Sequence, residues 1–212
     1  MPIDADKSTF YPCCSEMICR GCDYANQKSS NGGERCPFCR ELVSSGDEET
    51  HKRMMKRVKA NDPAALCQMG SKCYDKRDYD GAFEYLTKAA ELGDIEAHYQ
   101  LGYMYHQGDG VEKDEEKALY HYEKAVINGH PIARHNLASI EEENGNMERV
   151  VKHLIIAANL GCDESMKALW DHFKDGNITK EDLDATLRAH QAAIDTMKSA
   201  QRDIAEKYYG NK

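Results

Sequence analysis

The chain has 212 residues, of which 28 are Lys or Arg and 37 are Asp or Glu, giving a formal net charge of −9. Residues 1–60 are almost neutral, with ten basic and nine acidic side chains, whereas residues 61–212 have 18 basic and 28 acidic ones. Because an acidic surface repels a phosphate backbone, this composition disfavours nucleic acid as a partner and favours proteins with basic or mixed surfaces.

The sequence shows no sign of membrane insertion or export. It contains no apolar run near the ~18 residues that a membrane-spanning helix needs. Its first residues have neither the basic start nor the apolar core of a signal peptide. We therefore expect an intracellular protein, in the cytoplasm, the nucleus or both, with no membrane partner.

Six of the nine cysteines lie between residues 13 and 39, with the spacing CC-x4-C-x2-C-x13-C-x2-C. These are Cys13, Cys14, Cys19, Cys22, Cys36 and Cys39. A turn between cysteines two residues apart directs both sulfurs at one ion, and thiolates select Zn²⁺ with tetrahedral geometry. In an intracellular chain such pairs favour metal over disulfides. No histidine precedes His51, so we predict an all-cysteine zinc site.

The cysteine segment resembles the second and larger part of a RING finger of the all-cysteine kind. In that family eight ligands bind two zinc ions in a cross-brace. The resemblance aligns Cys13 and Cys14 with the third and fourth ligands, Cys19 and Cys22 with the fifth and sixth, and Cys36 and Cys39 with the last two. It implies one complete zinc site, formed by Cys13, Cys14, Cys36 and Cys39, and half of a second site, formed by Cys19 and Cys22.

The motif CPFCR at residues 36–40 matches the closing CPxCR of the RING finger. Pro37 follows the seventh ligand and Arg40 the eighth, where many RING ubiquitin ligases place a cation that bridges the conjugating enzyme and ubiquitin. If the RING is active, the resemblance implies that these two residues contact the conjugating enzyme.

The first two RING ligands are missing, because residues 1–12 contain neither Cys nor His. Asp4 and Asp6 do not have the required spacing. Three alternatives follow: a RING truncated at its N-terminus, a degenerate RING with one zinc ion, or a ribbon-like site formed by the four cysteines of the two C-x2-C pairs. We favour the first two, because they account for Cys13, Cys14 and Arg40.

Residues 43–62 are predicted to form a linker and a basic helix. Residues 44–49 are typical of a flexible joint and a helix start, and residues 50–62 have a helical pattern. The helix has five basic residues, Lys52, Arg53, Lys56, Arg57 and Lys59. We interpret them mainly as a solvated helix face, with a nuclear-import or acidic-partner patch as the alternative. Asp62-Pro63 predicts a helix start, because an Asp side chain can cap the free N–H groups of the first turn and Pro fits the first helical position.

A helix–turn–helix unit then repeats three times. Each unit ends at a glycine, Gly93, Gly129 or Gly161, and these glycines lie 36 and 32 residues apart. A fixed period in this range is typical of a solenoid of stacked helix pairs. In the middle unit Gly108-Asp-Gly110 ends the first helix, and the small residue Gly102 lies where a large side chain would hold the two helices apart.

Residues 101–130, LGYMYHQGDGVEKDEEKALYHYEKAVINGH, resemble a Sel1-like repeat, a relative of the tetratricopeptide repeat. The middle unit fits the family pattern at nearly every position, whereas the first and third units lack its GxGV turn. The resemblance implies an αα-solenoid that binds protein partners.

After the repeats, residues 164–173 predict a further first helix, with Trp170 in the solenoid core. Thr179 and Asp182 resemble a capping box that begins one long helix toward Tyr209. Its first half is expected to cap the solenoid and its second half to project. The run Glu141–Glu143 is interpreted as solvated and His98 as surface-like or partner-facing, and the histidines show no convincing ligand spacing.

We therefore predict a mainly α protein with an incomplete RING-like zinc module at 1–42, a linker and basic helix at 43–62, Sel1-like repeats at 63–178 and a capping helix at 179–212. The predicted function is a zinc-binding protein-interaction scaffold. The alternative is a RING-type ubiquitin ligase whose solenoid binds substrate and whose RING recruits a conjugating enzyme. A zinc-ribbon nucleic-acid binder is the weakest reading, because the module is nearly neutral. No catalytic residue, phosphate-binding glycine loop or nucleophile elbow is identified, so no small-molecule substrate is expected and enzyme status stays open.

Overall fold

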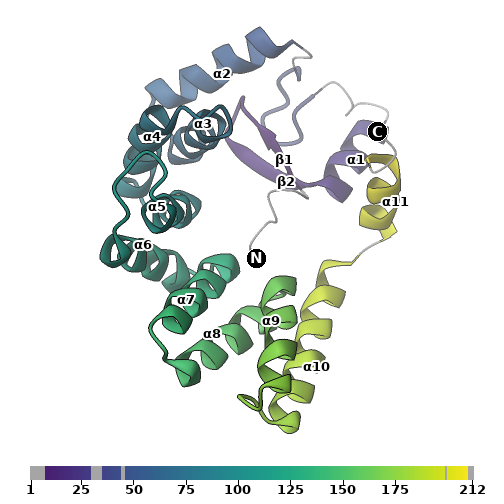
Figure 1. Ribbon diagram of the computed structural model, residues 1–212. Helices are drawn as coiled ribbons and strands as arrows, with labels where there is room; N and C mark the ends of the chain where they lie inside the picture. The colour runs from purple at the N-terminus through teal and green to yellow at the C-terminus, as the bar shows by residue number, and fades with distance from the viewer. Residues whose placement is uncertain (1–7, 30–34, 44–45, 199, 210–212) are drawn as a thin grey trace. The chain divides into compact units, whose positions relative to one another are not determined.

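The computed structural model describes residues 8–29, 35–43, 46–198 and 200–209 (Figure 1). Apart from one antiparallel hairpin, its regular elements are helices, and the predicted mainly α class is confirmed. In chain order they are β1 (Ser8–Tyr11), β2 (Glu16–Cys19), α1 (Arg20–Lys28), α2 (Asp47–Lys59), α3 (Pro63–Asp75), α4 (Tyr79–Glu91), α5 (Ile95–Gln107), α6 (Glu115–Ile127), α7 (Pro131–Glu143), α8 (Met147–Asn159), α9 (Asp163–Lys174), α10 (Lys180–Met197) and α11 (Ala200–Tyr209).

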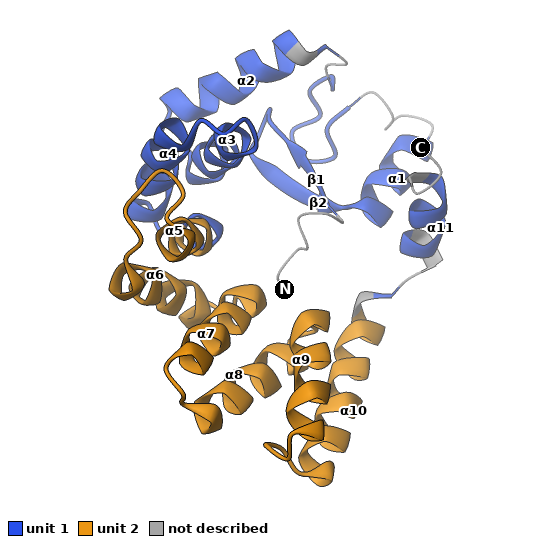
Figure 2. Ribbon diagram, viewed as in Figure 1, with its two compact units in different colours: residues 1–97, 198–212 blue, residues 98–197 orange. Residues whose placement is uncertain are grey.

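The chain divides into two compact units, shown in Figure 2. Unit 1 comprises residues 1–97 and 198–212, and unit 2 comprises residues 98–197. Unit 1 therefore contains the cysteine-rich segment, α2, the first helix pair and the C-terminal helix. The predicted boundaries after residues 42, 62 and 178 stay predictions.

In unit 1, α3 and α4 form the first helix pair and α2 packs on α3. The predicted helix start is confirmed, because the Asp62 side chain accepts a hydrogen bond from the Ala65 N–H at 3.0 Å. The two helices approach closely at Gly70, where an added Cβ would lie 2.6 Å from Leu86 Cγ. Leu86 is fully buried at this contact.

Unit 2 contains two buried apolar clusters that join consecutive helices. The first centres on Tyr122 of α6 and includes Ala118, Ala125, Val126, Ala133, Leu137 and Ile140. The second joins α7 to α10 and comprises Ala138, Val150, Leu154, Ala158, Met166, Leu169, Ile178 and Leu183. The predicted helix end at Gly129 is confirmed: its φ is 81°, and the following residue donates its N–H back to Ala125 O at 3.2 Å.

The C-terminal segment differs from the single long helix that the sequence predicted. The structure has two helices, with Lys198 outside helical conformation between them. α10 packs on α8 and α9, as expected for a cap, and buried His190 holds it there through Ala158 O at 2.8 Å and Asp163 Oδ1 at 3.0 Å. α11 belongs to unit 1 and packs on α1 instead of projecting. The predicted cap at Thr179 is present, because the Thr179 side-chain oxygen accepts a hydrogen bond from the Asp182 N–H at 3.1 Å.

Three further residues lie in surroundings that differ from those the sequence predicted. Trp170 is 43% exposed instead of filling the core, because Met166 and Leu169 occupy the inner face of α9. Glu141 is buried and paired with Arg149 at 2.8 Å, so the acidic run is not wholly solvated. His98 is only partly exposed, and its Nδ1 lies 3.0 Å from His121 Nδ1 in a partly buried pair. Each difference comes from packing between helices, which helical periodicity does not specify.

Among the described residues, no helix combines the length and the apolar character that crossing a membrane requires.

Candidate metal centre

Four of the six clustered cysteines converge in unit 1. Their sulfur atoms all lie within 4.8 Å of one another, and they belong to Cys13, Cys14, Cys36 and Cys39. The Cys14–Cys36 sulfurs are 3.6 Å apart and the Cys13–Cys39 sulfurs 3.4 Å apart. A tetrahedral zinc site with Zn–S bonds of about 2.3 Å separates its sulfurs by about 3.8 Å. The arrangement therefore has the dimensions of a four-thiolate zinc site.

Two tight turns present these sulfurs. The turn after β1 brings Cys13 and Cys14 forward, with the Cys14 and Ser15 N–H groups donating to Tyr11 O at 3.3 and 2.9 Å. The second turn is closed by the Cys36 N–H donating to Glu41 O at 2.8 Å. Inside it, the Phe38 N–H donates to Cys36 Sγ at 3.4 Å. A backbone hydrogen bond to a sulfur favours its thiolate form, which is the form that binds a metal ion.

The charge balance of the cluster favours a cation. Burial, followed by the hydrogen bonds to Cys39 and Cys36, raises the pKa of Cys13. Burial and the hydrogen bond to Cys36 raise the pKa of Cys14 to about 11. Burial opposes ionisation of Cys36 as well, but backbone hydrogen bonds from Cys39 and Phe38 lower its pKa. Four thiolates at these distances repel one another, so they require a metal ion to ionise together.

Cys19 and Cys22 lie outside this group. The four gathered cysteines are the set that the RING resemblance implies, and they differ from the set of the ribbon-like alternative. Cys19 precedes α1 and accepts a hydrogen bond from the Cys22 N–H at 3.5 Å. The role of these two residues as metal ligands stays a prediction.

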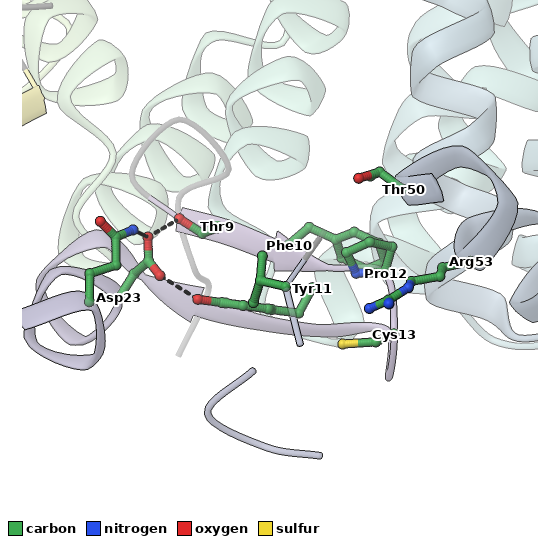
Figure 3. Close-up of a pocket in the computed structure, with 10 residues that line it drawn as sticks. Thr9, Phe10, Tyr11, Pro12, Cys13, Asp23, Thr50 and Arg53 are labelled. Carbon is green, nitrogen blue, oxygen red and sulfur yellow. Dashed lines mark hydrogen bonds between the residues drawn. The ribbon is translucent and has the colours of Figure 1, made fainter. Parts of the chain in front are cut away.

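A buried carboxylate that the sequence analysis missed fixes the hairpin beside the cluster. Asp23 of α1 is 2% exposed and accepts hydrogen bonds from Thr9 Oγ1 at 3.0 Å and Tyr11 Oη at 2.5 Å (Figure 3). Burial and the Asp23 carboxylate raise the pKa of Tyr11. The Tyr11 ring packs edge-on to Phe38, with centroids 6.4 Å apart, and so supports the second turn. An isolated Asp in a short helix has no periodic signal that would have revealed this role.

These residues also line a pocket of about 190 Å³ between the hairpin, α1 and α2, as drawn in Figure 3. Its walls come from Thr9, Phe10, Tyr11, Pro12, Cys13, Asp23, Gln27, Val43, Thr50 and Arg53. The pocket borders the cluster through Cys13.

The helix predicted as a basic, solvated face holds the cysteine segment in place. Arg57 of α2 donates from Nε to Ser15 Oγ at 3.1 Å and from a terminal nitrogen to Cys14 O at 3.2 Å. The same nitrogen is 2.5 Å from the cap residue Asp62. We call these three interactions the Arg57 clasp. Arg53 contributes in a similar way by donating to Leu42 O at 2.5 Å.

The solvated-face interpretation holds for the other three basic side chains of α2, Lys52, Lys56 and Lys59, which are exposed. The Arg57 clasp joins the backbone of a candidate metal ligand to the start of the first helix pair. Sequence patterns could not separate Arg57 from its basic neighbours, because two partners of its side chain, Ser15 and Cys14, lie 42 and 43 residues earlier.

The two predicted contact residues lie on the second turn. Arg40 is exposed and has a φ of 62°, and its carbonyl accepts a hydrogen bond from the Arg35 guanidinium at 3.0 Å. Pro37 is partly exposed. Their predicted contact with a conjugating enzyme stays a prediction.

Comparison with known proteins identifies the helix pairs. The Sel1 repeat family matches residues 63–94 and 95–130, which cover the pairs α3–α4 and α5–α6. These two segments therefore match Sel1 repeats, in agreement with the predicted Sel1-like pattern. The matched residues begin after the cysteine segment, which the match does not include.

Solved structures extend this likeness along the chain. A Sel1 repeat protein from Oxalobacter formigenes superposes with a TM-score of 0.62 at 28% identity, covering 73% of this chain and 66% of that one. The protective antigen c5321 of uropathogenic Escherichia coli, which displays an SLR fold, gives a TM-score of 0.57 at 19% identity and shows a likeness of fold alone, covering 87% of this chain and 39% of that one. The predicted αα-solenoid is thereby confirmed.

Curated relatives match a shorter part. The "Putative beta-lactamase HcpC" of Helicobacter pylori is 40% identical over 52 residues in strain 26695, and its counterpart in strain J99 is 39% identical over 56 residues. These matches cover 24% and 26% of this chain. The chain spans less than a fifth of the first relative, 18%, and 19% of the second.

Proposed function

We propose that this protein is a zinc-binding scaffold, in which Sel1 repeats bind a partner protein and a single four-cysteine zinc site stabilises the N-terminal segment. The repeats support the interaction role, because stacked helix pairs expose a long surface for protein binding. The observation that supports zinc is the convergence of four sulfurs within 4.8 Å. When bound, zinc would be held by Cys13, Cys14, Cys36 and Cys39 and would supply structural stabilisation.

The first test is the zinc content of the purified chain, measured by elemental analysis. We expect about one zinc per chain, lost in Cys36→Ser because Cys36 is fully buried among the other sulfurs. Cys73→Ser is the matched control, since Cys73 lies in α3 away from the cluster and should keep the full zinc content. A wild-type chain without zinc, or a Cys36→Ser variant that keeps it, would refute the metal site.

The partner is expected to be a protein with a basic or mixed surface, because residues 61–212 carry most of the negative charge. We also propose a compartment in which thiols stay reduced, the cytoplasm or the nucleus, since zinc thiolates require it.

A RING-type ubiquitin ligase is the second candidate. It is supported by the four-sulfur group itself, which matches the second site of a cross-brace, and by the exposed Arg40 beside it. Such a ligase acts by positioning a charged conjugating enzyme, without covalent chemistry of its own.

An autoubiquitination assay with a panel of conjugating enzymes separates the two candidates. Arg40→Asn removes the cation, and Asn tolerates the positive φ of 62° better than Ala does. Arg40→Lys keeps the charge and is the control. Activity that is lost in Arg40→Asn and retained in Arg40→Lys would establish the ligase, and inactivity of the wild-type chain with every enzyme would leave the scaffold.

A further inference from the structure

The helix pairs α5–α6 and α7–α8 differ at one aromatic position. Tyr105 and Glu141 are equivalent, because each lies 12 residues after the glycine that closes the preceding unit. His121 and His153 are equivalent as well, because each lies eight residues before the glycine that closes its own unit. The third unit therefore keeps the histidine but has a carboxylate where the second unit has an aromatic ring.

In the α5–α6 pair the tyrosine ring has two favourable neighbours. It stacks on His121, with ring centroids 5.7 Å apart and an angle of 15° between the planes. The Lys117 ammonium lies 5.2 Å from the centroid of the same ring. Stacked rings and a cation over a ring both stabilise an aromatic side chain. Tyr105 is thus held between helices by a histidine and a cation.

The α7–α8 pair has the same histidine and a cation, but a pocket instead of the ring. Arg149 is equivalent to Lys117, since each lies 12 residues before the glycine that closes its unit. The pocket has a volume of about 480 Å³, within the range of pockets that bind ligands. Its walls include Leu119, Val126, Leu137, Glu141, Arg149 and His153. Three apolar and three polar side chains from α6, α7 and α8 therefore surround the space.

The polar side chains of the pocket are suited to an aromatic ring. Burial, followed by the charge of Arg134, lowers the pKa of His153, so its imidazole is neutral at neutral pH and can stack. The Arg149 guanidinium pairs with Glu141 at 2.8 Å, and a planar guanidinium can lie on a ring while it holds a carboxylate. His153 Nδ1 is buried without a hydrogen-bond partner among the described residues. Native proteins rarely leave such an atom unsatisfied, so a bound segment is expected to supply its partner.

The rim of the pocket favours a basic group beside the ring. Glu123 lines the pocket from α6, is exposed, and has no ion pair within the part of the chain that the structure describes. Because Arg149 is already paired with Glu141, the uncompensated charge at the pocket is negative. Ile127 also lines it and is 78% exposed, which gives the rim an apolar surface. A Lys or Arg next to an aromatic residue complements this combination.

We propose that this pocket binds an aromatic side chain of a partner protein, in a segment that has Lys or Arg beside it. The ring takes the place that Tyr105 has in the second unit and lies against His153 and Arg149. The neighbouring cation faces Glu123. This inference rests on the proposed protein-binding role of the repeats and names the chemistry that one of their sites recognises.

Short capped peptides test the pocket on the full chain. Their central residue is phenylalanine, tyrosine, tryptophan or leucine, flanked on both sides by lysine or by glutamate. Binding is followed by the backbone amide shifts in NMR spectra, which detect weak affinities and locate the site. We expect shifts centred on α6, α7 and α8, tighter binding of aromatic than of leucine peptides, and tighter binding with lysine than with glutamate.

Variants of the pocket separate its parts. Glu141→Tyr supplies the ring of the second unit, so it should fill the pocket and abolish peptide binding. His153→Ala removes the stacking surface and should weaken the binding of aromatic peptides by about three- to tenfold. Glu123→Lys should reverse the preference for lysine over glutamate. Glu143→Lys is its control, because Glu143 is exposed, does not line the pocket and gives the same change in net charge.

Circular dichroism checks that each variant folds, and the last two substitutions test the pocket even without Glu141→Tyr. Aromatic peptides that bind no better than leucine peptides would overturn the proposal, and so would the absence of shifts on α6, α7 and α8 with every peptide. Binding that survives Glu141→Tyr in a folded chain would overturn it as well, but would leave the scaffold role intact, since the peptide is then held elsewhere on the repeats. Loss of zinc is measured separately and would count against the proposed metal site alone.

Discussion

Gly102 lies on α5 against the buried ring of Tyr122 on α6, and its replacement by alanine tests how the solenoid packs. A Cβ at this position would lie 2.7 Å from Tyr122 Cδ1 and 2.8 Å from Cε1. Carbon atoms in contact normally lie about 3.5–4.0 Å apart, so the ring or the helix must move by about 1 Å. The sequence already predicted that a large side chain here would separate the two helices.

The ring has little room to move. Tyr122 is fully buried, and its hydroxyl accepts a hydrogen bond from Asn136 Nδ2 at 3.1 Å. Overpacking of a buried contact costs about 1–3 kcal/mol. The replacement of glycine by alanine within a helix contributes about 0.5–1 kcal/mol in the opposite direction. We therefore expect Gly102→Ala to lower the free energy of unfolding by about 1–2 kcal/mol.

Urea unfolding followed by far-UV circular dichroism measures this difference. Gln107→Ala, an exposed position on the same helix, should change the free energy of unfolding by no more than about 0.5 kcal/mol. Combining Gly102→Ala with Tyr122→Leu should cost less than the sum of the single changes, because the smaller side chain relieves the clash. A Gly102→Ala variant as stable as the wild type, or additive effects in the double variant, would contradict the close approach.

Three other perturbations have expected outcomes. Removal of zinc by a chelator, or Cys36→Ser, should lower the thermal midpoint of unfolding measured by calorimetry, because structural zinc stabilises small modules by roughly 10–16 kcal/mol in apparent binding energy. Arg57→Gln should release zinc to a chelator faster and destabilise the chain by about 1–2 kcal/mol, because it removes the charged hydrogen bonds of the Arg57 clasp, which are partly exposed to solvent. The control Lys56→Gln should change neither the rate of zinc release nor the stability. Stability should be full above the ordinary histidine pKa of about 6.5 and fall as the pH is lowered toward 4, because burial and His98 lower the pKa of His121 to about 4 in the folded state. A urea midpoint of the wild type that does not change across this pH range would contradict that prediction. So would a His121→Gln variant whose urea midpoint depends on pH as steeply as that of the wild type.

Local chemistry made much of the solenoid predictable. Asp62-Pro63 favours a helix start, because a carboxylate caps free N–H groups and proline needs no hydrogen bond at the first helical position. Gly129 marks a helix end because glycine adopts a positive φ without strain. The repeat period then follows from such signals, and these helix limits agree with the structure.

The metal centre was predictable in part. The cysteine spacing indicated zinc and, with the RING resemblance, implied the four residues that the structure gathers. Spacing alone also allowed the ribbon-like set, because a C-x2-C turn presents two sulfurs whichever pair completes the site. The choice depends on the β1–β2 turn and on Asp23, which holds Tyr11 against the second turn.

What the sequence by itself determined were the features set within a few residues: the helices, their caps and the paired cysteines. Only the tertiary structure decided which partners those elements meet. Arg57 could not be distinguished from its basic neighbours until the fold placed Ser15 beside it, and no residue pattern foretold that α11 packs on α1. Long-range contacts of this kind depend on how elements pack, and residue patterns of period two or 3.6 contain no record of that.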